Sequence, residues 1–253
     1  MVQTAPPPGL LAALRRRLRT RAWRLVEGQH HIATRRLVDS AAEHEELERM
    51  LEASKPPLPP ASEGLHYLLR TPFRYPPLRH GSRLGTRLQP GIWYGAEQVA
   101  TAMAEVAFYR LWFLADCGGA VTTTSTEHTL FQVEIDARPG IDLTERRLLR
   151  WQAALADPAS WAVGQVTGVR LRGLGVHGCR YRSARRADGS NIALFSAAAF
   201  AVRTPDAATL QTWHCHATAQ SVTFTRRSAL QSEQFEFARA EFQVRGRDVR
   251  PMG

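Results

Sequence analysis

Residues 91–114 read Gly91-Ile-Trp-Tyr-Gly-Ala-Glu-Gln-Val-Ala-Thr-Ala-Met-Ala-Glu-Val-Ala-Phe-Tyr-Arg-Leu-Trp-Phe-Leu114. The part from Glu97 to Leu114 contains no glycine or proline and predicts a helix. Tyr94 lies just before this helix, where backbone N–H groups favour anions. Glu105 lies at the border of an apolar helix face, where a buried carboxylate is costly unless it is paired or functional. An exposed glutamate is the commoner alternative.

Around this stretch the chain does not alternate regularly between strands and helices, which predicts an α+β fold rather than a doubly wound sheet. Residues 65–96 are rich in glycine, proline, arginine and aromatics, and predict short strands and tight loops. Further helices are expected at residues 10–26, 33–53 and 143–156, and strands at residues 129–135, 191–202, 220–226 and 234–244.

Two proline-rich segments organise the N-terminal part. Residues 1–9 contain three consecutive prolines and are expected to be disordered. The run from Lys55 to Pro60 ends a helix, because proline cannot continue one. We therefore expect an N-terminal helical extension over residues 1–60 and a main domain over residues 61–253.

The charge balance indicates an anionic partner. The 253-residue chain carries a net charge of +10, and Lys55 is its only lysine. The charge alone is compatible with a nucleic acid, a dinucleotide or an acidic protein as the partner.

The three cysteines are odd in number and lack paired spacing, which predicts a reducing compartment without a structural disulfide. No apolar run is long enough to span a membrane and no signal peptide is recognisable, so we expect a cytoplasmic protein.

Three short motifs could carry chemistry. Phe73-Arg74-Tyr75-Pro-Pro places an arginine between aromatics and suits a phosphate clamp with a stacking surface, although a surface loop is equally expected. In Gly81-Ser-Arg83-Leu-Gly85-Thr-Arg87, glycines permit close backbone approach and the arginines can donate two hydrogen bonds each to a phosphate, without a P-loop or GxGxxG pattern. Gly178 to Arg185 resembles a short strand whose Ser183 can hydrogen-bond a sugar or amide.

A metal enzyme and a non-catalytic binding protein are two alternative classes of function for this sequence. His214 and His216 would point the same way from a strand, but no CxxC or HExxH spacing completes a metal site, so an ordinary strand beside Trp213 and no metal are expected. A basic protein that binds a nucleotide or nucleic acid without turnover would explain the charge. No helix-turn-helix, RRM or zinc-finger pattern supports direct nucleic-acid binding.

The motifs occur in an order that resembles the RES domain family, which is named for an arginine, a glutamate and a serine. The resemblance covers roughly residues 65–205, and the stretch from Trp23 to Ser40 resembles longer family members. It rests on Tyr67-Leu-Leu-Arg-Thr-Pro-Phe-Arg-Tyr-Pro-Pro77, Gly81-Ser-Arg83, Pro90-Gly-Ile-Trp-Tyr-Gly95, Thr101-Ala-Met-Ala-Glu105 and Tyr181-Arg-Ser-Ala-Arg185.

The resemblance implies a fold like the ADP-ribosyltransferase and diphtheria-toxin group, with a mixed β core and flanking helices. It also implies a toxin that takes NAD as substrate and is neutralised by an antitoxin carrying a helix-turn-helix domain, in a homo-oligomer or a hetero-oligomer with that antitoxin. By motif, the family arginine is Arg74 or Arg83, and the tyrosine, glutamate and serine are Tyr94, Glu105 and Ser183. Tyr75, Arg87 and Arg185 are further candidates for NAD binding.

The expected reaction cleaves the bond between nicotinamide and ribose through an oxocarbenium-like transition state. Under this hypothesis Arg74 and Arg83 hold the pyrophosphate, Tyr94 or Tyr75 stacks on the substrate, and Glu105 stabilises the ribose cation. Ser183 orients nicotinamide or ribose. Water, phosphate or a protein side chain could be the acceptor, so hydrolysis, phosphorolysis with phosphate as co-substrate, and mono-ADP-ribosylation remain open.

Overall fold

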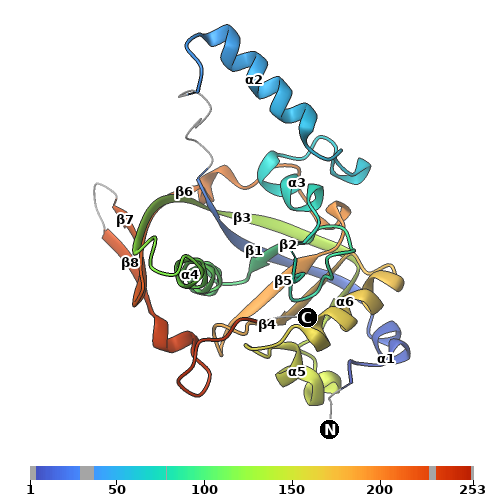
Figure 1. The fold of residues 1–253 in the computed structure, drawn as a ribbon. Helices are drawn as coiled ribbons and strands as arrows, with labels where there is room; N and C mark the ends of the chain where they lie inside the picture. Colours follow the sequence, from blue (N-terminus) through green and yellow to red (C-terminus); the bar gives the residue numbers. More distant parts are fainter. Residues whose placement is uncertain (1–3, 29–36, 78, 228–231, 252–253) are drawn as a thin grey trace.

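The computed structural model describes residues 4–28, 37–77, 79–227 and 232–251. An eight-stranded mixed sheet forms its centre, in the order β1-β2-β5-β4-β3-β6-β7-β8 (Figure 1). Only β3 and β4 pair in parallel among these strands. The strands are β1 (Arg16–Glu27), β2 (Trp93–Ala96), β3 (Thr123–Asp142), β4 (Gly178–Arg182), β5 (Ser190–Leu194), β6 (Gln211–Thr218), β7 (Ser221–Arg227) and β8 (Ser232–Ala238).

The long strand β3 connects two parts of this sheet. It pairs with β1 along nearly the whole of β1, and the pairings β1–β2, β2–β5, β5–β4, β4–β3 and β3–β1 close on themselves. From β3 the sheet continues through β6, β7 and β8. The closed part carries the residues of the site described below.

The described residues form six α-helices: α1 (Pro8–Ala13), α2 (Ala41–Ser54), α3 (Tyr67–Arg74), α4 (Val99–Asp116), α5 (Leu149–Leu155) and α6 (Ala162–Gly173). Helix α4 lies inside the curve of the sheet (Figure 1). Its Met103, Ala107 and Phe108 are buried in one cluster with Leu130 of β3 and Phe224 of β7. Helices α5 and α6 cover the other end of the domain, and α2 projects away from it (Figure 1). No helix in the described ranges has the length and apolar character of a membrane span.

The predicted α+β class is confirmed, and so is the helix over residues 97–114, which the structure places at Val99–Asp116. The strands expected at residues 129–135, 220–226 and 234–244 correspond to β3, β7 and β8, although β8 ends at Ala238. The expected strand over residues 191–202 is right only for β5, because a 3-10 turn follows it at Ala197–Ala199. The helix predicted over residues 143–156 is confirmed only as α5, because Arg146–Leu148 form a 3-10 turn and the residues before it are not helical.

The helix predicted over residues 10–26 is wrong beyond α1, because residues 16–27 form the strand β1. Its backbone pairs with β3 from Arg16 opposite Gly140 to Glu27 opposite His128. Arg17 forms an ion pair with Asp136 of β3 at 2.7 Å, and a second cross-strand pair joins Arg21 to Glu134 at 3.0 Å. This part of the predicted N-terminal extension therefore belongs to the central sheet.

The disorder expected for residues 1–9 is wrong for residues 4–9, while residues 1–3 lie outside the described ranges. The carbonyl group of Thr4 accepts a hydrogen bond from Trp151 Nε1 at 2.7 Å, and the next two carbonyl groups accept from Arg170. Helix α1 then begins at Pro8, where proline suits the first helical turn.

The helix predicted over residues 33–53 is confirmed only as α2; residues 33–36 lie outside the described ranges. Its start is later than expected because Ser40 and Glu43 form a capping box, and it ends at Ser54, directly before the proline-rich run that was predicted to stop it. Residues 67–74, expected in strands and loops, form α3, in which Pro72 lies inside the helix.

Candidate functional site

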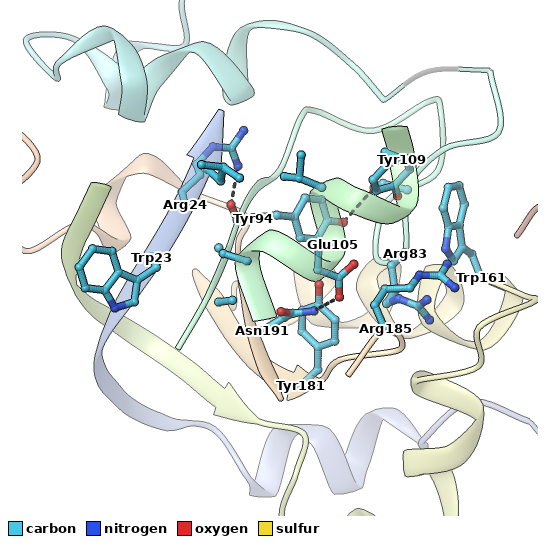
Figure 2. A pocket seen from close by; sticks show the side chains of 16 residues that line it. Trp23, Arg24, Arg83, Tyr94, Glu105, Tyr109, Trp161, Tyr181, Arg185 and Asn191 are labelled. Atoms are coloured by element: carbon cyan, nitrogen blue, oxygen red, sulfur yellow. Dashed lines mark hydrogen bonds between the residues drawn. The ribbon is translucent and has the colours of Figure 1, made fainter. Parts of the chain in front are cut away.

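A cavity of about 250 Å³ lies between α4 and the closed part of the sheet (Figure 2). Strands β1, β2, β4 and β5, helix α4 and three loops contribute to its wall. The lining residues are Trp23, Arg24, Leu25, Ser82, Arg83, Tyr94, Gly95, Ala96, Ala102, Glu105, Val106, Tyr109, Trp161, Tyr181, Arg185 and Asn191.

Glu105 projects from α4 into this cavity, and two side chains hold its carboxylate (Figure 2). Ser183 Oγ donates a hydrogen bond to Glu105 Oε1 at 2.7 Å, and Asn191 Nδ2 donates to the same oxygen at 2.6 Å. Ser183 Oγ in turn accepts hydrogen bonds from the backbone N–H groups of Arg185 at 3.0 Å and Arg186 at 3.2 Å. These two donors direct the hydroxyl proton of Ser183 toward Glu105, so the carboxylate has a fixed orientation.

Arg83 and Arg185 lie together on one side of Glu105 (Figure 2). Arg83 is buried and donates to the carbonyl groups of Leu155 and Asp157, each at 3.0 Å. Arg185 Nη1 donates to a third carbonyl group at 3.2 Å, and its guanidinium lies 3.4 Å from the centroid of the Phe108 ring. Burial lowers the pKa of Arg185 to about 10, although Glu105 opposes that change. Arg185 therefore remains a cation at neutral pH.

Arg24 of β1 lies on the other side of Glu105 in Figure 2. It donates to the carbonyl group of Tyr94, and its guanidinium lies 5.4 Å from the centroid of the Trp93 ring. Its Nε is buried without a hydrogen-bond partner among the described residues, and burial lowers its pKa to about 10. Within the described ranges, Arg24, Arg83 and Arg185 form no ion pair, so their charge is available to a bound anion.

The loop that carries Arg83 is held from two sides. Tyr94 hydroxyl accepts from the N–H group of Leu84 at 3.2 Å and shares a hydrogen bond with Ser82 Oγ at 2.9 Å. On the other side, Gly164 and Gly168 of α6 let the helix backbone approach the loop closely. A Cβ atom at these positions would lie 2.2 Å from the carbonyl oxygen of Arg83 and 1.8 Å from that of Leu84.

Three tyrosines of the wall are neutral hydroxyl groups at physiological pH. Burial raises the pKa of Tyr94 and of Tyr181 well above the ordinary value. Desolvation in the cavity wall also raises the pKa of Tyr109, a partly exposed side chain, to about 12, and the nearby carboxylate of Glu105 adds to this effect. Each can therefore donate a hydrogen bond to a polar ligand.

The structure brings together five of the residues predicted from the motifs: Arg83, Tyr94, Glu105 and Arg185 line the cavity, and Ser183 contacts Glu105. Arg74, Tyr75 and Arg87 do not line it. Arg74 lies at the end of α3 rather than on a strand. It donates to Glu52 Oε1 at 2.6 Å and to the carbonyl group of Pro56. Arg87 is exposed, and Tyr75 lines a neighbouring groove.

Sequence reasoning missed Arg24, Tyr109, Tyr181 and Asn191 as lining residues. Asn191 had a visible signal, because it is a polar residue in a strand whose five residues are all buried. Arg24 has none as long as residues 10–26 are predicted to form a helix. In β1 the buried residues Leu18 and Ala22 alternate with exposed arginines, and Arg24 lies on the same strand face as this buried pair. The alternation becomes informative only once residues 16–27 are known to form a strand.

Among the described residues, no group of three or more His, Cys, Asp or Glu side chains is placed to hold a metal ion. His214 and His216 lie on β6 as expected for an ordinary strand, and both are exposed. Cys117, Cys179 and Cys215 are free cysteines.

Comparison with known proteins connects the chain to one family. The family model described as RES domain matches residues 58–218. Among solved structures, a chain of the M. tuberculosis MbcT-MbcA toxin-antitoxin complex is similar at 14% identity with a TM-score of 0.45. That alignment covers 84% of this chain and 92% of the other. The search of curated proteins found no match.

Proposed function

This chain belongs to the RES domain family, and on that premise we propose that it is the toxin of a toxin–antitoxin pair and depletes NAD by cleaving the nicotinamide–ribose bond. One observation carries the proposal. The Glu105 carboxylate is held by Ser183 and Asn191 inside a cavity that three unpaired arginines line among the described residues. A fixed carboxylate beside an anion-binding region suits a substrate that combines a reacting sugar with a pyrophosphate.

Glu105 supplies the electrostatic part of the reaction. As the bond from C1′ of the ribose to the nicotinamide nitrogen breaks, its electron pair leaves with the nicotinamide, and positive charge develops on the ribose. A carboxylate oriented in advance stabilises this charge without having to reorganise, which is worth roughly 3–4 kcal/mol. The two hydrogen bonds to Oε1 provide that orientation.

The arginines divide by their position around Glu105. Arg83 and Arg185 lie together and would bind the pyrophosphate, because guanidinium groups donate paired hydrogen bonds to phosphate oxygens. Arg24 lies apart from them and would bind a second anion. This favours inorganic phosphate as acceptor: a phosphate oxygen forms the new bond to C1′, and ADP-ribose 1″-phosphate and nicotinamide are the products.

The test is Glu105→Gln, because the amide retains an oxygen that can accept from Ser183 and Asn191 while the negative charge is removed. We expect the variant to consume NAD about 100-fold more slowly or worse, with the free energy of unfolding preserved. Glu236→Gln is the matched control, since Glu236 is exposed on β8. Consumption at the wild-type rate by Glu105→Gln would refute the assignment.

The acceptor is tested with the wild-type protein by following NAD in the presence and absence of phosphate and identifying the product by mass spectrometry. Phosphorolysis requires phosphate and yields ADP-ribose 1″-phosphate. Free ADP-ribose would instead indicate water, and a mass increase of a protein would indicate ADP-ribosylation.

The toxin role is tested by expression in bacteria. We expect the wild-type chain to arrest growth while its intracellular NAD falls, and Glu105→Gln to do neither. We further propose a neutralising antitoxin with a helix-turn-helix domain. Co-expression of the protein encoded beside this chain should restore growth and co-purify with it; growth arrest without loss of NAD would contradict the proposal.

A further inference from the structure

A second, larger hollow, the outer groove, adjoins the cavity that contains Glu105, which we call the catalytic cavity. The outer groove has a volume of about 780 Å³. The two share Ser82, Tyr94, Tyr109 and Trp161, so they lie next to each other along one wall. Aromatic side chains make up much of the remaining wall, namely Tyr75 after α3 and Trp112 and Phe113 of α4.

Helix α4 connects the two spaces. Glu105, Tyr109, Trp112, Phe113 and Asp116 follow one another at spacings of four, three, one and three residues, which places them on one face of the helix. With a rise of about 1.5 Å per residue, Trp112 lies roughly 10 Å along the helix from Glu105. The face therefore begins with the carboxylate in the catalytic cavity and continues as an aromatic wall in the outer groove.

The aromatic wall is organised before any ligand binds. The rings of Tyr109 and Trp112 are stacked at 6.0 Å with an interplanar angle of 14°, and Trp161 lies 6.3 Å from Trp112. Phe113 and Tyr75 are 49% and 41% exposed, which leaves their rings accessible to a flat ligand. Exposed apolar side chains that gather along a groove are typical of a ligand-binding surface.

We propose that the outer groove binds the adenosine end of NAD, with the adenine ring against Phe113 and Tyr75. This inference rests on the proposed NAD-cleaving function. The catalytic cavity, at about 250 Å³, is below the usual range for a pocket that encloses a whole ligand, so a dinucleotide must extend beyond it. The outer groove is the adjoining space, and its aromatic wall offers the stacking surface that a nucleobase uses.

The charges along α4 agree with this order. Arg83 and Arg185 lie on the same side of Glu105 as Tyr109 and Trp161 (Figure 2), and these two aromatic residues also line the outer groove. A pyrophosphate at Tyr109 would therefore separate a ribose at Glu105 from an adenosine at Phe113, as the covalent structure of NAD requires. Tyr75 would keep its predicted role in NAD binding, although it lies outside the catalytic cavity.

The experiment measures the two halves of NAD separately, by calorimetric titration of the full-length protein with adenosine 5′-monophosphate and with nicotinamide mononucleotide. We expect both to bind to the wild-type protein. Phe113→Ala and Tyr75→Ala should each weaken adenosine monophosphate about tenfold and leave nicotinamide mononucleotide unchanged. Tyr67→Ala, which removes a similarly exposed aromatic ring outside the groove, should change neither.

Turnover gives a second measurement. The groove variants should lower kcat/KM for NAD about tenfold and leave kcat/KM for nicotinamide mononucleotide as a substrate unchanged. If only nicotinamide mononucleotide bound, or if both groove variants bound adenosine monophosphate like the wild type, the outer groove would not be the adenosine site, and the NAD-cleaving proposal would stand. Failure of both halves to bind would overturn both proposals.

Discussion

The contact between α6 and the loop that carries Arg83 predicts that replacing Gly168 with alanine destabilises the protein. In the structure the backbone of this buried helix position lies directly against the carbonyl group of Leu84. A Cβ atom at residue 168 would be 1.8 Å from that oxygen, where about 3.4 Å is an ordinary contact. Both atoms belong to backbone, so Gly168→Ala requires the helix and the loop to separate.

The magnitude follows from two opposing effects. Overpacking of this kind costs about 1–3 kcal/mol, and a clash between backbone atoms lies at the upper end. Alanine in place of glycine inside a helix returns about 1 kcal/mol. The net expectation is a loss of about 2 kcal/mol in the free energy of unfolding. Because the loop carries Arg83, a shift of about 1 Å should also lower the rate of NAD consumption by up to 100-fold.

Gly173 provides the matched control on the same helix. It is exposed, and a Cβ atom there meets nothing within 4 Å. Gly173→Ala should therefore raise the free energy of unfolding by about 0.5 kcal/mol, so urea denaturation should separate the two variants by about 2.5 kcal/mol. Equal stability of the two variants would refute the close packing of α6 on the loop.

Three further predictions test the site and the core. Arg24→Met should lower kcat/KM for NAD about tenfold or more without loss of stability, because it removes a charge that has no counterion among the described residues. Arg19→Met, at an exposed position of the same strand, is the control and should leave kcat/KM unchanged. Equal kcat/KM values for the two variants would show that Arg24 does not bind the substrate. Asn191→Ala should lower kcat about tenfold, since Glu105 loses one of its two hydrogen bonds, and an unchanged kcat would show that Ser183 alone orients the carboxylate. Burial lowers the pKa of His128 from 6.5 to about 4, so between these two pH values only the unfolded state protonates this imidazole. The free energy of unfolding should therefore fall by about 2 kcal/mol from pH 7.5 to pH 5. Denaturation curves of His128→Gln should lack this part of the pH dependence.

Helix α4 could be predicted because its signal is local. Eighteen residues without glycine or proline favour a helix wherever they lie in the fold, and its two ends need only a small correction. The capping box at Ser40 is also local, and it explains why α2 begins later than the hydrophobic periodicity suggested.

Strand β1 could not be predicted in this way, because its partner is distant in the sequence. Its arginines favour a helix about as well as a strand when they are considered alone. The decision comes from β3, where Asp136 and Glu134 lie more than 100 residues away and meet Arg17 and Arg21 across the pair. Since β1 was missed, Arg24 was missed with it, although it lines the same cavity as Glu105.

Arg74 and Arg83 show why motifs alone do not identify an anion-binding arginine. Both follow an aromatic or glycine-rich pattern, and the sequence offers no reason to prefer one. In the structure Arg74 meets the carboxylate of Glu52, so its charge is already neutralised. Arg83 donates only to carbonyl groups among the described residues, which orient the guanidinium but leave its charge uncompensated. A buried cation without a counterion is stabilised when an anion binds. An arginine that binds a ligand therefore differs from a structural arginine in its partners, and the sequence alone does not show these partners.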